Sequence, residues 1–249
     1  MRGSEASIFI ASPAVAHQRK HRCDPAFGYN FIAGDYDQWI WQKIWQLVEW
    51  PAIESFVAKL SLKNAKLLDI GVGTGKYIEK LNLLCNDFEL FGIDISPRMV
   101  ERAKARGSKF ATIEQGDVSA LSFQDNFFDI ILLCRVGSHL ENLDKAFGEV
   151  HRTLKPGGIF VYTDIHASHK YKCTAIPVGR DGPEKIEIKT YKHRLGDVKK
   201  CMKKNGIIID SVKIIATSDI INTKLDDLPK SIDLLDGNKP VSFIIFSRN

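Results

Sequence analysis

The stretch LLDIGVGTGKY, Leu67 to Tyr77, decides the fold of this chain. An apolar run that ends in Asp69 predicts a buried strand, and KYIEKLNLL behind the loop predicts a helix. Three glycines stand on alternate positions between them: Gly71, Gly73 and Gly75. There the backbone can turn tightly and offer bare N–H groups to a ligand. A dinucleotide fingerprint needs glycine at position 76, where Lys76 stands, so the loop predicts an adenosine-bearing ligand without a pyrophosphate.

Strands and helices alternate behind this loop. The segments 88–95, 109–115, 127–134 and 159–164 predict strands, and 127–134 is nearly continuously apolar, which is typical of a strand buried on both faces. Ser96 and Pro97 open one predicted helix. Apolar residues at helical spacing between 143 and 154 predict another, which KPGG ends. This rhythm predicts a doubly wound α/β sheet that binds ligands at the carboxyl ends of its strands.

The C-terminal region breaks this rhythm. The segments 206–215 and 241–249 predict strands with no helix of good length between them, and an antiparallel pair at one sheet edge is the simplest arrangement. We therefore divide the chain into a flexible leader (1–24), an N-terminal helical lid (25–62) and a binding domain (63–249). Within that domain, 165–195 is an insertion expected to cover the acceptor.

Composition limits the possible partners. A chain of 249 residues with 44% hydrophobic residues is long enough for one large domain with a substantial core. The net charge of +5 is modest, and solvated lysines account for it more simply than a nucleic-acid surface. Five cysteines without a Cys-x-x-Cys spacing argue against a zinc site or a disulfide framework and favour a reducing cytoplasm. No apolar run reaches membrane-spanning length, so no membrane partner is expected.

Acidic residues recur where the next strands end. Asp94 closes the second strand, where a carboxylate can accept hydrogen bonds from both ribose hydroxyls. Asp117 lies beyond the third strand, where it can bind the adenine amino group while the N–H of Val118 meets a ring nitrogen. Each aspartate alone could be a helix cap or a turn residue, and only their joint placement favours a nucleoside site.

Four segments together resemble the class I S-adenosylmethionine-dependent methyltransferases: LLDIGVGTGKY, FGIDISPRMVERAKA, EQGDVSALSFQDNFFDIILL and EVHRTLKPGGIFVYTD. Within that class they are similar to the small-molecule group that includes ubiquinone-pathway and natural-product enzymes. The resemblance implies a Rossmann-like sheet of seven strands, mostly parallel, with an antiparallel C-terminal hairpin. It implies S-adenosylmethionine as cofactor and S-adenosylhomocysteine as product. The cofactor site it implies comprises Tyr36, Asp69, Gly71, Gly73, Gly75, Asp94, Ile95, Met99, Asp117, Val118, Cys134 and Arg135.

The segment CRVGSHL after the fourth strand limits the classes of acceptor that the enzyme could methylate. It lacks the Asn/Asp-Pro-Pro-Tyr/Phe motif of enzymes that methylate base amines and the Pro-Cys pair of those that methylate base carbons. Cys134 stands where catechol-type enzymes carry a carboxylate that holds magnesium, and we treat it as a thiol that lines the pocket. No metal is expected.

All four tryptophans lie in or beside QWIWQKIWQLVEW, residues 38–50. One apolar stripe of this predicted helix consists of Ile40, Ile44, Leu47 and Val48. Trp41 and Trp45 form a neighbouring stripe, which is either a homodimer contact or part of a lid that excludes water from the methyl transfer. Tyr36 resembles the N-terminal tyrosine that the family often places over the cofactor.

Methylation of a neutral hydroxyl requires a base, and histidine has a suitable pKa. His139, five residues beyond Cys134, is the first choice and His193 the second. The alternative for His139 is that it caps the following helix or packs beneath the loop. His166 and His169 in the insertion are candidates for lining the acceptor site, although a solvated face is the simpler alternative for each.

The expected function is a cytoplasmic, metal-independent methyltransferase that acts by direct SN2 transfer. Its acceptor is a hydroxyl or amine of a small metabolite, such as an aromatic or polyketide-like secondary metabolite. Two alternatives stay open. One is an RNA- or protein-modifying methyltransferase that docks through the lysine-rich segment 185–204, and the other is a cofactor-binding protein without activity.

Overall fold

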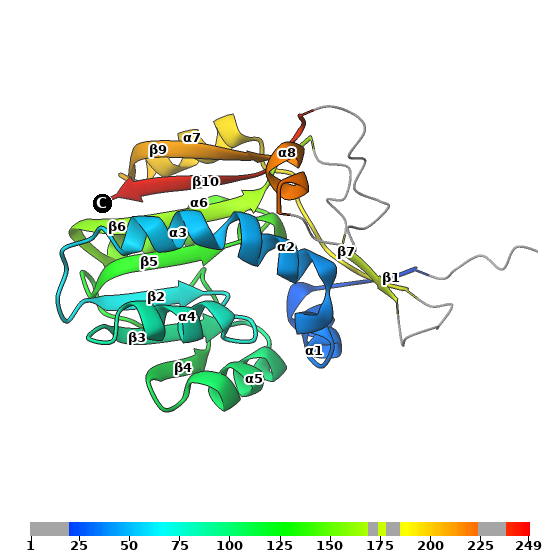
Figure 1. Ribbon diagram of the computed structural model, residues 1–249, viewed down its shortest axis with the longest axis horizontal. Helices are drawn as coiled ribbons and strands as arrows, with labels where there is room; N and C mark the ends of the chain where they lie inside the picture. The colour runs from blue at the N-terminus through cyan, green and yellow to red at the C-terminus, as the bar shows by residue number, and fades with distance from the viewer. Residues whose placement is uncertain (1–19, 169–173, 178–184, 224–237) are drawn as a thin grey trace, which may run out of the picture.

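The computed structural model describes residues 20–168, 174–177, 185–223 and 238–249. Its centre is a seven-stranded sheet in the order β4-β3-β2-β5-β6-β10-β9 (Figure 1). The strands are β2 Lys66–Ile70, β3 Glu89–Asp94, β4 Ala111–Gln115, β5 Phe128–Cys134, β6 Leu154–Ile165, β9 Ile208–Ala216 and β10 Pro240–Arg248. Strands β2 to β6 are parallel, whereas β10 is antiparallel to both β6 and β9. The predicted Rossmann-like sheet with an antiparallel C-terminal hairpin is confirmed.

The crossover helices are α4 Lys76–Leu84, α5 Pro97–Gly107, α6 Leu143–Thr153, α7 Leu195–Lys204 and the short α8 Thr217–Ile221. Ser96 caps α5 as predicted, because its Oγ accepts a hydrogen bond from the Met99 N–H at 3.2 Å. Helix α7 was not predicted. The segment KPGG was predicted only to end a helix, but it lies inside β6. There Gly157 adopts a φ of 73°, and the pairing of β6 with β5 shifts register.

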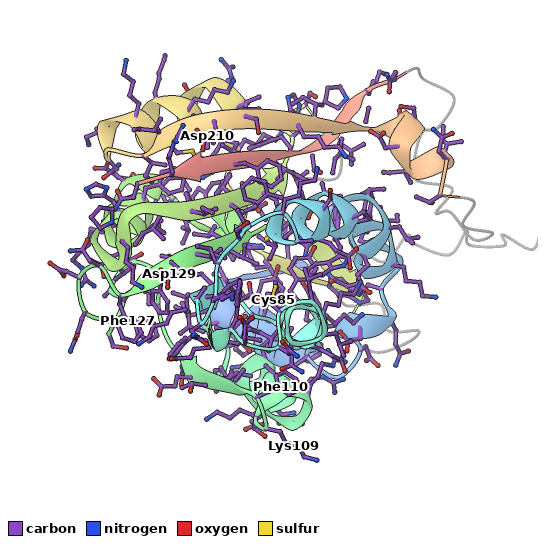
Figure 2. All side chains as sticks on the ribbon, turned by 60° about the vertical axis from the view of Figure 1, so that its left-hand side comes forward. Cys85, Lys109, Phe110, Phe127, Asp129 and Asp210 are labelled. Carbon is purple, nitrogen blue, oxygen red and sulfur yellow. The ribbon has the colours of Figure 1, made fainter. Side chains whose placement is uncertain are left out.

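The sheet carries a hydrophobic core on each face, and the side chains of each strand alternate between the two. In β5, Ile130 and Leu132 belong to the core under α2, α3, α4, α5 and α8, whereas Ile131 and Leu133 belong to the core under α6 and α7. Figure 2 shows that side chains fill the space between the sheet and its helices. Near the start of β5, Asp129 accepts hydrogen bonds from the Lys66 N–H and from Lys155 Nζ.

The N-terminal segment contains α1 Pro25–Ile32, the short 3-10 helix η1 Tyr36–Gln38, α2 Ile40–Val48 and α3 Trp50–Val57. The predicted single tryptophan-rich helix is thus two helices that meet at Glu49. Pro51 lacks the N–H that would continue the helical hydrogen bonds of α2. Helix α3 packs on the sheet, where the Phe56 ring stacks on Phe246 with centroids 4.3 Å apart, so residues 50–57 belong to the body of the domain.

A second, three-stranded sheet lies beside α1 at the carboxyl ends of the central strands (Figure 1). It joins β1 Lys20–Cys23 to β8 Lys185–Ile188 in parallel, and β8 pairs antiparallel with β7 Thr174–Pro177. The expectation that 1–24 is a flexible leader is therefore wrong for Lys20–Cys23, and residues 1–19 lie outside the described part. The partner strand is in the insertion, too distant in sequence to be inferred from local patterns.

Candidate active site

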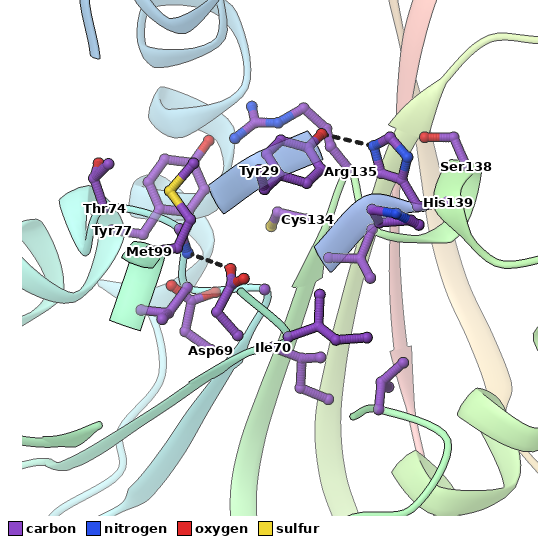
Figure 3. A pocket seen from close by; sticks show the side chains of 18 of the residues that line it. Tyr29, Asp69, Ile70, Thr74, Tyr77, Met99, Cys134, Arg135, Ser138 and His139 are labelled. Atoms are coloured by element: carbon purple, nitrogen blue, oxygen red, sulfur yellow. Dashed lines mark hydrogen bonds between the residues drawn. The ribbon is translucent and has the colours of Figure 1, made fainter. Parts of the chain in front are cut away.

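A cavity of about 520 Å³ lies at the carboxyl ends of the parallel strands, beneath α1, η1 and α2 (Figure 3). Its lining includes eleven of the twelve predicted cofactor residues: Tyr36, Asp69, Gly71, Gly73, Asp94, Ile95, Met99, Asp117, Val118, Cys134 and Arg135. Gly75 is the exception. It begins α4 with a φ of 81°, and a Cβ there would lie 3.1 Å from the Cα of Ala103, so Gly75 allows α4 and α5 to pack closely.

The glycine loop differs from the expectation that it offers bare N–H groups. The Gly71 N–H donates to the Ile93 carbonyl at 2.8 Å, and the Gly73 N–H donates to Asp94 Oδ2 at 2.9 Å. Both groups are engaged because the loop lies against the end of β3. The glycines provide space and left-handed backbone instead. Gly71 has a φ of 74°, and a Cβ there would overlap Val136.

Two buried carboxylates lie at the base of the cavity. Asp94 is 8% exposed, and its two oxygens accept hydrogen bonds from the N–H groups of Gly73 and Ser96, each at 2.9 Å. Burial raises the pKa of Asp94, and these two hydrogen bonds act against the rise. Asp69 is 2% exposed, and burial raises its pKa to about 7 although Arg135 favours the charged form. Each oxygen of Asp94 has a second lone pair with which it can bind a ligand hydroxyl.

The walls next to Asp94 suit an adenosine. Met99 and Val118 are buried and apolar and line the cavity, while Ile95 is partly exposed at its edge. Asp117 also lines the cavity, and its Oδ1 accepts a hydrogen bond from the Ser119 N–H at 2.8 Å. Asp117 is thus a turn residue as well as a candidate ligand. Carboxylates beside flat apolar walls match the ribose and adenine of the cofactor that the sequence implies.

Arg135 connects the end of β5 to the N-terminal helices. Its backbone has a φ of 61°, and its guanidinium donates to Glu49 Oε2 at 2.9 Å and lies 5.6 Å from the ring centroids of Trp45 and Tyr77. Glu49 is fully buried. Its burial raises its pKa, whereas the charge of Arg135 lowers it. Cys134 beside it is buried too, which raises the pKa of its thiol and keeps it protonated, as expected for a group that only lines the pocket.

Asp37 fastens η1 to the glycine loop and α5. Its Oδ1 accepts a hydrogen bond from Thr74 Oγ1 at 2.6 Å, and its Oδ2 accepts one from the Arg106 guanidinium at 3.0 Å. Lys76 Nζ is 3.4 Å from the same carboxylate. Burial acts to raise the pKa of Asp37, but these partners outweigh it and lower the pKa. Sequence reasoning missed Asp37, for which the only available signal was its position next to Tyr36.

The tryptophans of α2 face the cavity. Trp41 and Trp45 both line it, and their rings stack with centroids 5.1 Å apart. Within the predicted apolar stripe, Ile44 and Val48 are buried, whereas Leu47 is 43% exposed. This orientation agrees with a lid, and the homodimer contact through α2 stays a prediction.

His139 lines the cavity in the loop after β5. Its Nε2 lies 2.7 Å from the Tyr29 hydroxyl and its Nδ1 lies 3.0 Å from the Lys189 carbonyl oxygen. It does not cap α6, because Asn142 does so by accepting a hydrogen bond from the Asp144 N–H. Burial lowers the pKa of His139, which favours the neutral imidazole. Tyr29 was not predicted, since nothing in the sequence places α1 next to His139.

The other predicted histidines lie elsewhere. His193 is not part of the cavity lining, and its Nε2 lies 2.8 Å from the Leu140 carbonyl oxygen, next to His139 in the chain. His166 is also absent from the lining, and its Nδ1 lies 2.7 Å from Ser168 Oγ. His169 lies outside the described residues.

Within the described ranges, no three His, Cys, Asp or Glu side chains group in a way that could hold a metal ion. Asp164, near the end of β6, accepts hydrogen bonds from the Tyr162 hydroxyl at 2.9 Å and the Ile165 N–H at 2.8 Å. Over the same ranges, no helix has both the length and the apolar character needed to cross a bilayer.

Known proteins resemble this chain in sequence and in fold. A methyltransferase domain family matches residues 68–162, from β2 to β6. An uncharacterised protein of Methanocaldococcus jannaschii is 30% identical over 220 residues, which cover 80% of each chain. A demethylmenaquinone methyltransferase of Leptospira interrogans is 35% identical over 105 residues. The matched region covers 40% of this chain and 42% of that enzyme, which is under half of the enzyme's length. An S-adenosylmethionine-dependent methyltransferase from Mesorhizobium loti shares the fold, with a TM-score of 0.64 at 19% identity over 83% of this chain and 100% of that one.

Proposed function

Because this chain belongs to the class I S-adenosylmethionine-dependent methyltransferases, we propose that it methylates a hydroxyl or amine of a small metabolite. The observation that carries the proposal is a single cavity, covered by the N-terminal helices, that is lined by eleven of the twelve predicted cofactor residues and by the half-buried His139. A small acceptor fits a recessed cavity of this kind, whereas a macromolecule needs a wide approach to the reacting group.

The cofactor supplies an electrophilic methyl group on a positively charged sulfonium. In the proposed complex, Asp94 binds the ribose hydroxyls while Met99 and Val118 flank the adenine. Asp117 binds the adenine edge. The buried carboxylate of Asp69 is the negative group nearest the glycine loop in the chain, and its charge favours the cationic cofactor.

The remaining lining supports an aromatic acceptor. Trp41 and Trp45 offer ring faces for stacking, and Gln42 and Gln46 of the same helix add amide groups that can orient a few polar substituents. A compact aromatic secondary metabolite fits this combination. The N-terminal helices exclude water while the acceptor and the methyl group align.

His139 is the proposed base. Its imidazole is half-buried and lines the cavity, and desolvation lowers its pKa, which favours the neutral form that can take up the proton released by a hydroxyl acceptor. His193 is proposed to position the loop, because its ring donates a hydrogen bond to the carbonyl of Leu140. In this assignment, His139 is the one histidine that takes up the proton.

The test is to incubate the protein with a small-molecule metabolite extract and S-adenosylmethionine that carries a deuterated methyl group. Mass spectrometry should find a small molecule with one added labelled methyl, formed together with S-adenosylhomocysteine. Label in added RNA or protein in place of a metabolite would overturn the small-molecule assignment. Binding of the cofactor in calorimetry without any labelled product would mean a non-catalytic binding protein.

A further inference from the structure

Tyr29 of α1 lines the cavity beside His139. Its hydroxyl lies 2.7 Å from His139 Nε2, and Figure 3 shows it pointing at the imidazole. The Tyr29 ring lines the cavity and is held edge-on by two neighbours, His139 at 5.2 Å and Tyr36 at 5.8 Å between centroids. Its position is thus fixed from both sides.

The direction of the Tyr29–His139 hydrogen bond follows from the other ring nitrogen. His139 Nδ1 is 3.0 Å from the Lys189 carbonyl oxygen, which can only accept, so Nδ1 carries the proton of the neutral ring. His139 Nε2 is then the acceptor, and the Tyr29 O–H donates to it. The only basic lone pair of His139 is therefore already occupied by Tyr29.

We propose that Tyr29 is a catalytic residue that relays the acceptor's proton to His139. This inference rests on the proposed methylation of a hydroxyl. The acceptor hydroxyl donates a hydrogen bond to Tyr29 Oη, which still has a lone pair to accept it. An acceptor that used His139 directly would have to displace Tyr29 first.

The proton transfer balances in charge and atoms. As the acceptor oxygen forms its bond to the methyl carbon, the carbon–sulfur bond breaks and its electron pair stays on sulfur as a neutral thioether. The acceptor proton moves to Tyr29 Oη, and the Tyr29 proton moves to His139 Nε2. The positive charge lost at sulfur reappears on the imidazolium, whose Nδ1–H remains bonded to Lys189 and which later releases its extra proton to water.

The small sheet β1-β8-β7 aligns both ends of this relay. Tyr29 follows β1 through α1, and Lys189 follows β8, the strand that pairs with β1. The Lys189 N–H donates to the Cys23 carbonyl at 2.9 Å, and a Cβ at Gly28 would overlap Ile188, so α1 lies directly against β8. Both groups that touch the imidazole thus rest on the same pair of strands.

The first arm of the test needs no acceptor. Long-range proton–nitrogen NMR of the full chain with S-adenosylhomocysteine should show His139 protonated at Nδ1 and unprotonated at Nε2. Tyr29→Phe removes a hydrogen-bond donor to the neutral ring and should therefore raise the pKa of His139. The nearby carboxylate of Asp164, which also raises this pKa, is present in both proteins. Protonation at Nε2, or an unchanged pKa in the variant, would overturn the relay.

The second arm measures turnover on the labelled metabolite found above. Tyr29→Phe should lower kcat by about 10²- to 10⁴-fold, as should His139→Ala, and the double variant should be no slower than the slower single one. Affinity for S-adenosylhomocysteine should stay unchanged, and Tyr191→Phe serves as the control because Tyr191 is absent from the cavity lining. Near-normal turnover of Tyr29→Phe would mean that His139 acts directly, whereas no product from the unaltered protein would refute the proposed function itself.

Discussion

The buried carboxylate of Asp94 has both a structural role and a proposed role in binding. It fixes the glycine loop through the Gly73 N–H and the start of α5 through the Ser96 N–H. It also lines the cavity at the point where the proposed ribose hydroxyls lie. A substitution there removes a charged hydrogen-bonding partner from a site that is largely closed to water.

We expect Asp94→Ala to weaken S-adenosylhomocysteine binding by about 2 to 3 kcal/mol, since bonds to a charged partner are worth about that much. Isothermal titration calorimetry measures it. Glu114→Ala is the matched control, because Glu114 is an exposed acid near the end of the neighbouring strand β4. Unchanged affinity of the Asp94 variant would show that the ribose site has been misplaced.

Asp69 predicts a dependence of stability on pH. Its pKa is raised from 3.8 to about 7 in the folded protein, so between these values the folded chain holds a proton that the unfolded chain has lost. Stability from this group is therefore lost as the pH rises through that window. Above the pKa of Asp69 in the folded protein, the cost of keeping this carboxylate buried and charged no longer changes with pH.

Asp69→Asn removes this titration. The quantity to compare is the unfolding free energy of the variant minus that of the natural chain. This difference should be roughly 2 to 3 kcal/mol larger at about pH 8 than at about pH 5. Urea unfolding without cofactor at both pH values tests this. A difference between the two proteins that does not change with pH would contradict the assignment of a raised pKa to Asp69.

At the scale of the element, the N-terminal lid is held by polar contacts at two points. Asp37 of η1 binds Thr74 and Arg106, and Asn30 Oδ1 of α1 accepts hydrogen bonds from Ser96 Oγ at 2.7 Å and the Arg98 N–H at 3.0 Å. These partners belong to the glycine loop and to α5. The N-terminal helices, which form the predicted lid, are thus fastened to segments that carry predicted cofactor residues.

We expect Asp37→Ala to weaken S-adenosylhomocysteine binding about tenfold, because Tyr36 next to it loses its anchor over the cavity and Arg106 loses a charged partner. Hydrogen exchange of residues 25–48 should also become faster. Asp35→Ala is the control, since Asp35 is exposed and its side chain does not cap η1. Equal affinity and equal exchange in the two variants would show that the lid needs no such anchor.

At the scale of the whole molecule, one buried ion pair connects the N-terminal helices to the central sheet. Glu49 lies at the junction of α2 and α3, and Arg135 follows β5. A buried charge without its partner is costly, so the pair makes the position of the lid depend on the folded sheet.

We expect Glu49→Ala to lower the unfolding free energy by about 3 to 5 kcal/mol, because it leaves the largely buried Arg135 guanidinium without its carboxylate partner. Asp210→Ala breaks an exposed pair with Arg248, whose atoms are 2.7 Å apart, and should cost less than about 1 kcal/mol. Urea unfolding of both variants makes the comparison. Similar small losses in the two would mean that Glu49 is not needed to dock the lid.

The sequence by itself determined the central sheet, and it picked out eleven residues that line one cavity, where the predicted cofactor site stays a prediction. The strand, the glycine loop and the helix of 65–84 are adjacent in the chain, so their pattern of apolar residues and glycines specifies local structure directly. Asp94 and Asp117 could be placed because parallel strands bring their carboxyl ends to one sheet edge. These features depend on local periodicity and on a general rule of topology.

Only the tertiary structure decided which groups from distant segments of the chain meet. Tyr29 and His139, Glu49 and Arg135, and β1 and β8 come from segments that are distant in the chain, and single residues such as Tyr29 carry no periodic signal that would reveal a partner. Even the glycine N–H groups, expected to face a ligand, are bound to the neighbouring strand β3. Local patterns specify elements, whereas long-range contacts depend on how those elements pack, and here the packing set the direction of the hydrogen bond at His139.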